Sequence, residues 1–119
     1  MCGLLAYAGD VTGLPDFNTV FSQLVHRGPD DTELFKVDNN NASMCFHRLA
    51  IMDPTQKGHQ PFTDESNGNM VICNGEIYNF ESLRHDYEKS YNFKSHSDCD
   101  VLVPMYRDLG IEKMCQNLD

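Results

Sequence analysis

The spacing of the apolar segments constrains the fold of this chain more than any other feature. Strand-like runs occupy residues 3–9, 32–37, 43–53 and 69–73. Several of the connections between them, such as the turn at 38–42, are shorter than the roughly dozen residues that a parallel crossover needs. The sequence therefore predicts an α+β fold with an antiparallel sheet.

Two helices are expected between and after these strands. Pro15 opens the first, and residues 26–29 (HRGP) end it. One apolar face of this helix is indicated by residues three and four positions apart, namely Phe17, Val20, Phe21, Leu24 and Val25. Residues 80–89 predict the second helix, and residues 54–60 have the composition of a loop.

A third helix is expected to begin at Ser97. Asp100 lies three residues later, which predicts a capping box. Pro104 conflicts with a helix interior, where a proline costs about 3 kcal/mol. Gly110 is expected to end the helix.

The composition excludes several function classes. The chain has 9 Lys and Arg residues against 18 Asp and Glu residues, a formal net charge of −9. Nucleic acid and anionic membrane surfaces both require a cationic face. No apolar run approaches the roughly 20 residues of a membrane-spanning helix, and no secretory signal is visible. We therefore expect neither a nucleic acid nor a membrane as partner.

The cysteines and histidines indicate a reduced, metal-free protein. The odd set of five cysteines contains no CxxC pair and consists of Cys2, Cys45, Cys73, Cys99 and Cys115. Neither a disulfide framework nor a structural zinc site is expected, and a cytoplasmic location fits best. His26, His47 and His59 lack the spacing of metal ligands, so we interpret them as structural residues.

Cys2 is the first candidate for catalysis. Gly3 follows it, and Met1 precedes a small residue, a terminus from which the initiator methionine is commonly removed. The freed residue would combine a thiol and an amine, groups whose ordinary pKa values are about 8.5 and about 7.7–8.0. Such an amine can accept the thiol proton, directly or through one water. The alternative is that Cys2 is a small buried apolar residue.

Asn74-Gly75-Glu76 has two interpretations. Asn-Gly between two apolar runs predicts the turn of a β-hairpin. Alternatively, the Asn74 side-chain amide and the Gly75 N–H form an oxyanion hole, where glycine permits close approach of a substrate. The local sequence does not separate the two.

Arg48 and Asp98 are candidates for binding a charged substrate. Arg48 lies in an otherwise apolar strand, where alternation would turn it to solvent. If it faces a pocket, its planar guanidinium suits a carboxylate. Asp98 is either a carboxylate favoured at a helix start by the dipole or a partner for a substrate ammonium.

Six short motifs, considered together, are more specific than any single residue. They are MCG at residues 1–3, HRGPDD at 26–31, HRLAIMD at 47–53, GHQPF at 58–62, NGEIYN at 74–79 and SDCD at 97–100. In their order and spacing they resemble class II glutamine amidotransferases, most closely the glutaminase domain of glutamine-hydrolysing asparagine synthetases. The resemblance covers essentially the whole chain.

The resemblance implies a reaction mechanism. Cys2 would attack the side-chain amide of glutamine with its own amine as base, and Asn74 and Gly75 would stabilise the oxyanion. Ammonia would leave, and water would release glutamate from the Cys2 thioester. The implied catalytic residues are Cys2, Asn74 and Gly75.

The resemblance also implies how glutamine is bound. Arg48 would bind the α-carboxylate, backbone groups through Met52 would line the site, and two acids would take the α-ammonium. The complete implied set is Arg48, Leu49, Ala50, Ile51, Met52, Asn74, Gly75, Glu76 and Asp98.

The implied fold is an N-terminal-nucleophile hydrolase αββα sandwich, with residues 1–119 as the first part of its glutaminase domain. Further core strands, typically beginning with a Gly-x-Phe-Ala-Phe run, would be expected after Asp119. The synthetase domain, which would use ATP and magnesium, is expected to be absent, so no cofactor is expected in this domain.

The implied partners are glutamine and a synthetase domain or chain that uses the ammonia to make an amide on aspartate. The resemblance leaves a homodimer open. Two alternatives remain: a glutaminase module of another class II amidotransferase, and a non-catalytic, truncated fragment that binds glutamine or another protein.

Overall fold

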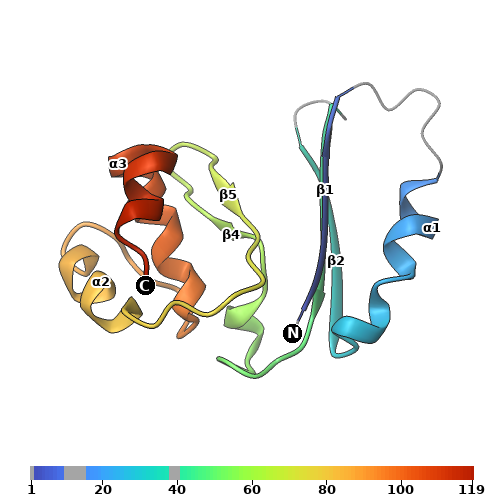
Figure 1. Ribbon diagram of the computed structural model, residues 1–119, viewed down its shortest axis with the longest axis horizontal. Helices are drawn as coiled ribbons and strands as arrows, with labels where there is room; N and C mark the ends of the chain where they lie inside the picture. Colours follow the sequence, from blue (N-terminus) through green and yellow to red (C-terminus); the bar gives the residue numbers. More distant parts are fainter. Residues whose placement is uncertain (1, 10–15, 38–40) are drawn as a thin grey trace. The chain divides into compact units, whose positions relative to one another are not determined.

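The computed structural model describes residues 2–9, 16–37 and 41–119. The chain divides into two compact units, Met1–Ala50 and Ile51–Asp119, whose positions relative to one another are not determined (Figure 1).

The first unit is built on a three-stranded antiparallel sheet in the order β1-β3-β2. Its strands are β1 (Gly3–Ala8), β2 (Asp31–Val37) and β3 (Ala42–Arg48). Side-chain exposure alternates along β1, as expected for a strand with one covered face. The antiparallel sheet and the strands predicted at 3–9 and 32–37 are confirmed, although β1 is exposed on its other face.

Helix α1 (Phe17–Ser22) packs beside this sheet (Figure 1). Its first turn is capped by the Asp16 carboxylate, which accepts a hydrogen bond from the Asn18 N–H at 3.1 Å. The buried ring of Phe21 stacks on the His47 ring, with 3.8 Å between centroids. The helix ends at Ser22, with Gln23 as its C-cap, and Val25–Arg27 form a separate 3₁₀ turn, η1. The observed helix is therefore shorter than the apolar pattern, which extends to Val25, predicted.

His47 is a buried structural residue, as predicted. Its Nε2 donates to the carbonyl oxygen of Phe21 at 2.9 Å, because a carbonyl can only accept. Its Nδ1 bonds to the Thr32 hydroxyl at 2.7 Å. One imidazole thus joins α1 to β2 and β3.

Gly28 permits a close approach of two backbone segments. A Cβ at this position would lie 2.2 Å from the carbonyl oxygen of His47 and 2.6 Å from the carbonyl carbon of Arg48. Immediately beyond it, the Asp30 N–H donates to the Arg48 carbonyl at 3.0 Å. Only glycine lets residues 28–30 lie against the end of β3.

The second unit contains a short hairpin and two longer helices (Figure 1). Its elements are the 3₁₀ turn η2 (Gln56–Gly58), β4 (Phe62–Thr63), β5 (Met70–Val71), α2 (Phe80–Tyr87), the 3₁₀ turn η3 (Asp98–Val101) and α3 (Leu102–Gln116). β4 and β5 pair antiparallel, with Phe62 opposite Val71. Between them the Asp64 carboxylate accepts from the Ser66 hydroxyl and N–H, and these bonds lower the pKa of Asp64.

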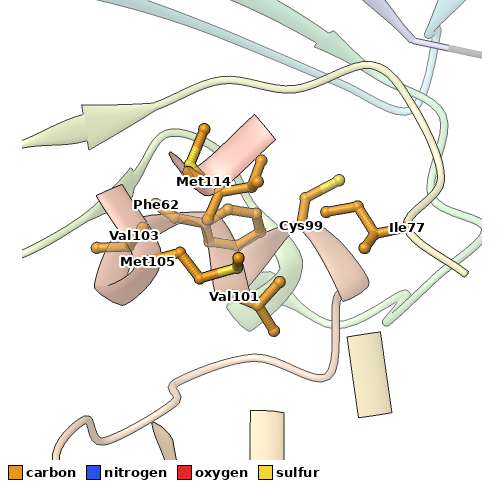
Figure 2. Close-up of a cluster of buried hydrophobic side chains, with 8 residues drawn as sticks. Phe62, Ile77, Cys99, Val101, Val103, Met105 and Met114 are labelled. Carbon is orange, nitrogen blue, oxygen red and sulfur yellow. The ribbon is translucent and has the colours of Figure 1, made fainter. Parts of the chain in front are cut away.

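Apolar side chains from all parts of the second unit form its core. Figure 2 shows the Phe62 ring surrounded by side chains of η3 and α3, with Ile77 beside Cys99. The buried members are Phe62, Ile77, Cys99, Val101, Leu102, Val103, Met105 and Met114. Ile77 belongs to a loop, so the core fixes this loop as well as the regular elements.

The third predicted helix exists, but its start differs from the prediction. Ser97 makes no side-chain cap, and the Asp100 carboxylate instead accepts from the N–H and hydroxyl of Ser95, at 3.1 and 2.8 Å. The capping box is therefore wrong. Pro104 lies in the first turn of α3, where its missing N–H has no helical acceptor to lose. Gly110 breaks the helix with φ 72°, but a further helical segment follows it.

Two strand predictions need correction, and one strand was missed. The strand predicted at 43–53 ends at Arg48, and Asp53, within the predicted range, has a positive φ of 45°. The strand predicted at 69–73 is the two-residue β5, and β4 was not predicted. The helix at 80–89 is confirmed as α2. Pro15 and most of the turn predicted at 38–42 lie outside the described residues.

We predict that Gly28→Ala destabilises the fold by about 1–3 kcal/mol, the usual cost of overpacking. The added methyl group would meet backbone atoms of His47 and Arg48, which cannot rotate away. Urea denaturation followed by circular dichroism measures the change.

Gly75→Ala is the matched control for this prediction. A Cβ at Gly75 would meet only the Cys73 sulfur, at 3.7 Å, an ordinary contact. Its midpoint should stay close to that of the unmodified chain. Equal midpoints for the two alanine variants would contradict the close approach at Gly28.

Candidate functional site

The Cys2 side chain is held by the backbone of Leu49. The Leu49 N–H donates to the Cys2 sulfur at 3.4 Å, and the thiol lies 3.8 Å from the Leu49 carbonyl oxygen. Cys2 is half-buried. The Arg27 Nε donates to the Cys2 carbonyl at 3.0 Å and thereby fixes its main chain. The alternative interpretation, a small buried apolar residue, would require full burial. Cys2 is only half-buried, and hydrogen bonds hold both its sulfur and its main chain.

Arg48 is buried at the end of β3, with 5% of its surface exposed. The alternative that strand alternation turns it to solvent is thus wrong. In the sheet register Arg48 lies opposite Asp31. Burial of a guanidinium requires hydrogen-bonding partners and suits a site for an anion.

The residues that follow Arg48 leave the sheet. Ala50 donates its N–H to the Asp30 carboxylate at 2.8 Å. Ile51 and Met52, which begin the second unit, have exposed side chains.

Asp53, the last residue of the HRLAIMD motif, is bonded within the second unit to His96, the residue before the SDCD motif. Its carboxylate accepts the His96 N–H at 2.8 Å and the Thr55 hydroxyl at 2.6 Å. The hydrogen bond from His96, and then that from Thr55, lowers the pKa of Asp53. This side chain holds the start of η2 beside the segment that leads into Asp98.

Asn74 and Gly75 do not form the turn of a β-hairpin. A type I′ turn needs positive φ at both central residues. Among the described residues, positive φ occurs at Asp53, Gly9, Gly68 and Gly110, and so at neither Asn74 nor Gly75. The chain runs instead from β5 through this exposed segment into α2. The hairpin interpretation is wrong.

The carboxylate of Asp98 holds the loop that contains these residues. Its Oδ2 accepts the Ile77 N–H at 2.8 Å, and Asp98 is 4% exposed. Glu76, one residue before Ile77, is exposed. Asp98 also lies in the first turn of η3, so the helix-start interpretation describes its position correctly but misses its contact with the loop.

Gln60, from the GHQPF motif, fixes the start of the same loop. Its side-chain amide accepts the Cys73 N–H at 2.6 Å and donates to the Cys73 carbonyl at 3.1 Å. These two bonds imitate a strand pairing and set the position of the backbone just before Asn74.

The structure thus assembles the predicted residues in two clusters, one in each unit. The first cluster contains Cys2, Arg48, Leu49 and Ala50. The second contains Asn74, Gly75, Glu76 and Asp98. Ile51 and Met52 stand at the start of the second unit with exposed side chains.

Four residues that position these clusters were not predicted: Arg27, Asp30, Asp53 and Gln60. All four lie within the motifs HRGPDD, HRLAIMD and GHQPF. Membership of these motifs was the only feature of the sequence that could have identified the four residues. Each of them makes a long-range hydrogen bond to a backbone group, and motif spacing does not predict such bonds.

Within the described residues, no helix has the length and apolar character needed to cross a membrane. In the same residues, no group of three or more His, Cys, Asp or Glu side chains is arranged to hold a metal ion.

Comparison with known proteins identifies relatives over the entire chain. A probable glutamine-hydrolysing asparagine synthetase of Acanthamoeba polyphaga mimivirus is 35% identical over 124 residues, covering 100% of this chain and 22% of the relative. A probable glutamine-hydrolysing asparagine synthetase of Schizosaccharomyces pombe is 37% identical, covering 99% of this chain and 21% of the relative. The amidase chry2 of Gibberella zeae is 31% identical, covering 81% and 14%.

The chain spans about a fifth of the length of the two synthetases that it matches. A family model described as a glutamine amidotransferase domain matches residues 1–119. This match agrees with the resemblance carried by the six motifs. The chain therefore belongs to the class II glutamine amidotransferase domain family.

Proposed function

We propose that this chain is the glutamine-hydrolysing part of an asparagine synthetase, with Cys2 as its nucleophile after removal of Met1. One observation carries the proposal. The Cys2 sulfur is hydrogen-bonded to Leu49, the residue next to the buried Arg48 that would bind glutamine. The nucleophile and the carboxylate-binding residue thus belong to one connected cluster.

The Cys2 sulfur would attack the side-chain amide carbon of glutamine. The α-amine of the same residue would take the thiol proton and pass it to the departing ammonia. The Leu49 N–H, 3.4 Å from the sulfur, would hold the sulfur in position for this attack. A thioester forms, and a water molecule then releases glutamate and regenerates the thiol.

Asn74 and Gly75 would stabilise the negative charge that develops on the amide oxygen. The Asn74 side-chain amide and the Gly75 N–H are donors of the kind found in oxyanion holes. The segment is exposed yet fixed at both ends, by Gln60 at Cys73 and by Asp98 at Ile77. Such fixation supports the role, because an oxyanion hole acts through donors that are already in place.

The charged residues would select free glutamine. Arg48 would bind the α-carboxylate, with backbone groups from Leu49 to Met52 beside it. Glu76 and Asp98 would bind the α-ammonium. One cation and two anions match the two charged groups of the amino acid, and the buried Arg48 and Asp98 could discriminate most strongly.

The remaining parts of the proposal follow from the family. The complete domain would be an N-terminal-nucleophile sandwich, and its ammonia would be used on aspartate by a synthetase domain or chain. ATP and magnesium would act there, so the glutaminase reaction itself would need no cofactor.

The amidase among the relatives favours a second candidate, in which the same glutaminase chemistry serves another acceptor. The two candidates differ in the partner that takes the ammonia. Detection of an aspartate-activating domain in the same or an associated polypeptide would distinguish them.

We predict that Cys2→Ala abolishes glutamate release while leaving glutamine binding largely intact. The substitution removes the sulfur but none of the groups assigned to substrate binding. Glutamate release is measured by an enzyme-coupled assay and binding by calorimetry, on chains whose loss of Met1 has been verified by intact mass.

Cys115→Ala is the matched control, since Cys115 is exposed on α3. It should turn over like the unmodified chain. Undiminished glutamate release by Cys2→Ala would rule out the proposed nucleophile.

We predict that Arg48→Ala weakens glutamine binding by roughly 2–5 kcal/mol, because a substrate carboxylate would lose its charged partner. Arg48→Lys should recover part of this loss, since it keeps the charge without the planar fork. Calorimetry with glutamine measures both, and urea denaturation verifies that each variant is folded.

Arg107→Ala is the control for the loss of an arginine. Arg107 lies on α3 and pairs with its neighbour Asp108. An unchanged affinity in folded Arg48→Ala would remove Arg48 from the proposed site.

We predict that Asp98→Asn separates binding from folding. Asparagine retains an oxygen that can accept the Ile77 N–H but loses the negative charge, so affinity for glutamine should fall by about tenfold or more at similar stability. Asp98→Ala should also destabilise the chain by about 1–3 kcal/mol, because the buried Ile77 N–H loses its acceptor. An Asp98→Asn chain that binds glutamine normally would assign Asp98 a purely structural role.

A further inference from the structure

Two cysteines that the proposed mechanism does not use flank the loop of the second cluster. Cys73 directly precedes Asn74, and Cys99 directly follows Asp98. Both sulfurs lie near Gly75. The Cys73 sulfur is 3.7 Å from the position of a Gly75 Cβ, and the Cys99 sulfur is 4.0 Å from the Gly75 carbonyl oxygen.

Both cysteines are held by well-defined contacts. The Cys73 backbone is fixed by the two hydrogen bonds from Gln60. Cys99 is 3% exposed in η3 and packs beside Ile77 in the core (Figure 2). The fold of the second unit therefore holds both sulfurs beside Gly75.

The two thiols differ chemically. The hydrogen bond between them lowers the pKa of Cys73 and raises the pKa of Cys99, which burial raises further. Cys73 is also the more exposed of the two. An oxidant would therefore reach Cys73 first, and the buried Cys99 would serve as the second thiol.

The three remaining cysteines differ from this pair in burial or in proposed role. Cys45 is fully buried in β3, and burial raises its pKa to about 11. Cys115 is exposed on α3, and Cys2 is the proposed nucleophile. Reactivity towards oxidants requires thiolate character and access, so Cys45 is expected to be inert.

We propose that Cys73 and Cys99 form a site of oxidative modification, at which a peroxide converts the two thiols to a reversible disulfide. The Cys73 thiolate attacks the peroxide oxygen, which gives a sulfenic acid and, with one proton, water. Cys99 then attacks that sulfur. The S–S bond forms as the S–O bond breaks, and a second water leaves. The peroxide gains two electrons, and the chain loses two hydrogens.

The disulfide would change the loop next to it. The sulfurs must approach to about 2.05 Å, closer than two hydrogen-bonded thiols. Because Gly75 lies beside both of them, this contraction would shift Asn74 and Gly75. If the proposed function holds, oxidation would therefore weaken glutamine binding without touching Cys2.

The test uses the full chain carrying Cys2→Ala and Cys115→Ala, which leaves three of the five cysteines. The protein is treated with hydrogen peroxide, unfolded and alkylated with N-ethylmaleimide. We expect one maleimide adduct instead of three, a Cys73–Cys99 cross-link in the peptide map, and full reversal by dithiothreitol. Three adducts after treatment, or a cross-link that involves Cys45, would overturn the proposal.

Single substitutions in the same background test the order of the steps. Cys99→Ser should stop at a Cys73 sulfenic acid that dimedone traps. Cys73→Ser should leave Cys99 unmodified. Dimedone labelling of Cys99 in Cys73→Ser, at the rate seen for Cys73, would contradict the assigned roles.

Glutamine affinity before and after oxidation tests the coupling to the loop. Calorimetry on the same chain should show a loss of about tenfold or more that dithiothreitol restores. A mapped disulfide with unchanged affinity would overturn the coupling alone. Absence of glutamine binding before oxidation would overturn the proposed function. The presence or absence of the Cys73–Cys99 cross-link would still show whether the two cysteines are a site of oxidation.

Discussion

The hydrogen bond from the Ile77 N–H to the buried Asp98 carboxylate is the interaction on which the second cluster depends. Ile77 is the one buried residue between exposed Glu76 and Tyr78, so its side chain anchors the loop in the core while its N–H orients the backbone. A buried carboxylate is costly unless it is paired and hydrogen-bonded. The Ile77 N–H supplies one such hydrogen bond, and the carboxylate in turn fixes the loop.

In the first unit, main-chain contacts fix the surroundings of Cys2. Gly28 brings residues 28–30 against the end of β3, and the Leu49 main chain then meets the Cys2 sulfur. Arg27 adds a bond to the Cys2 carbonyl. The HRGPDD motif therefore shapes the surroundings of Cys2 without supplying a group that reacts.

Elements with strong local patterns were predicted from the sequence, and those set by distant contacts were not. The strands β1 and β2 and the helix α2 follow from apolar pattern and turn residues. The strand predicted at 43–53 is correct as far as Arg48, beyond which the Leu49 N–H contacts the Cys2 sulfur. The capping box is wrong, because the Asp100 carboxylate bonds to Ser95 instead. For the site, the family motifs supplied the residues, but burial of Arg48 and the Asp98–Ile77 bond required the structure.

The contact between Leu49 and Cys2 has a consequence for sequence variation. Both of its hydrogen bonds use the peptide groups of Leu49, and the leucine side chain takes no part in them. Nineteen of the genetically encoded residues offer the same N–H, and proline alone lacks it. The contact with the sulfur therefore tolerates apolar and polar residues alike at position 49. Proline there would remove the N–H donor.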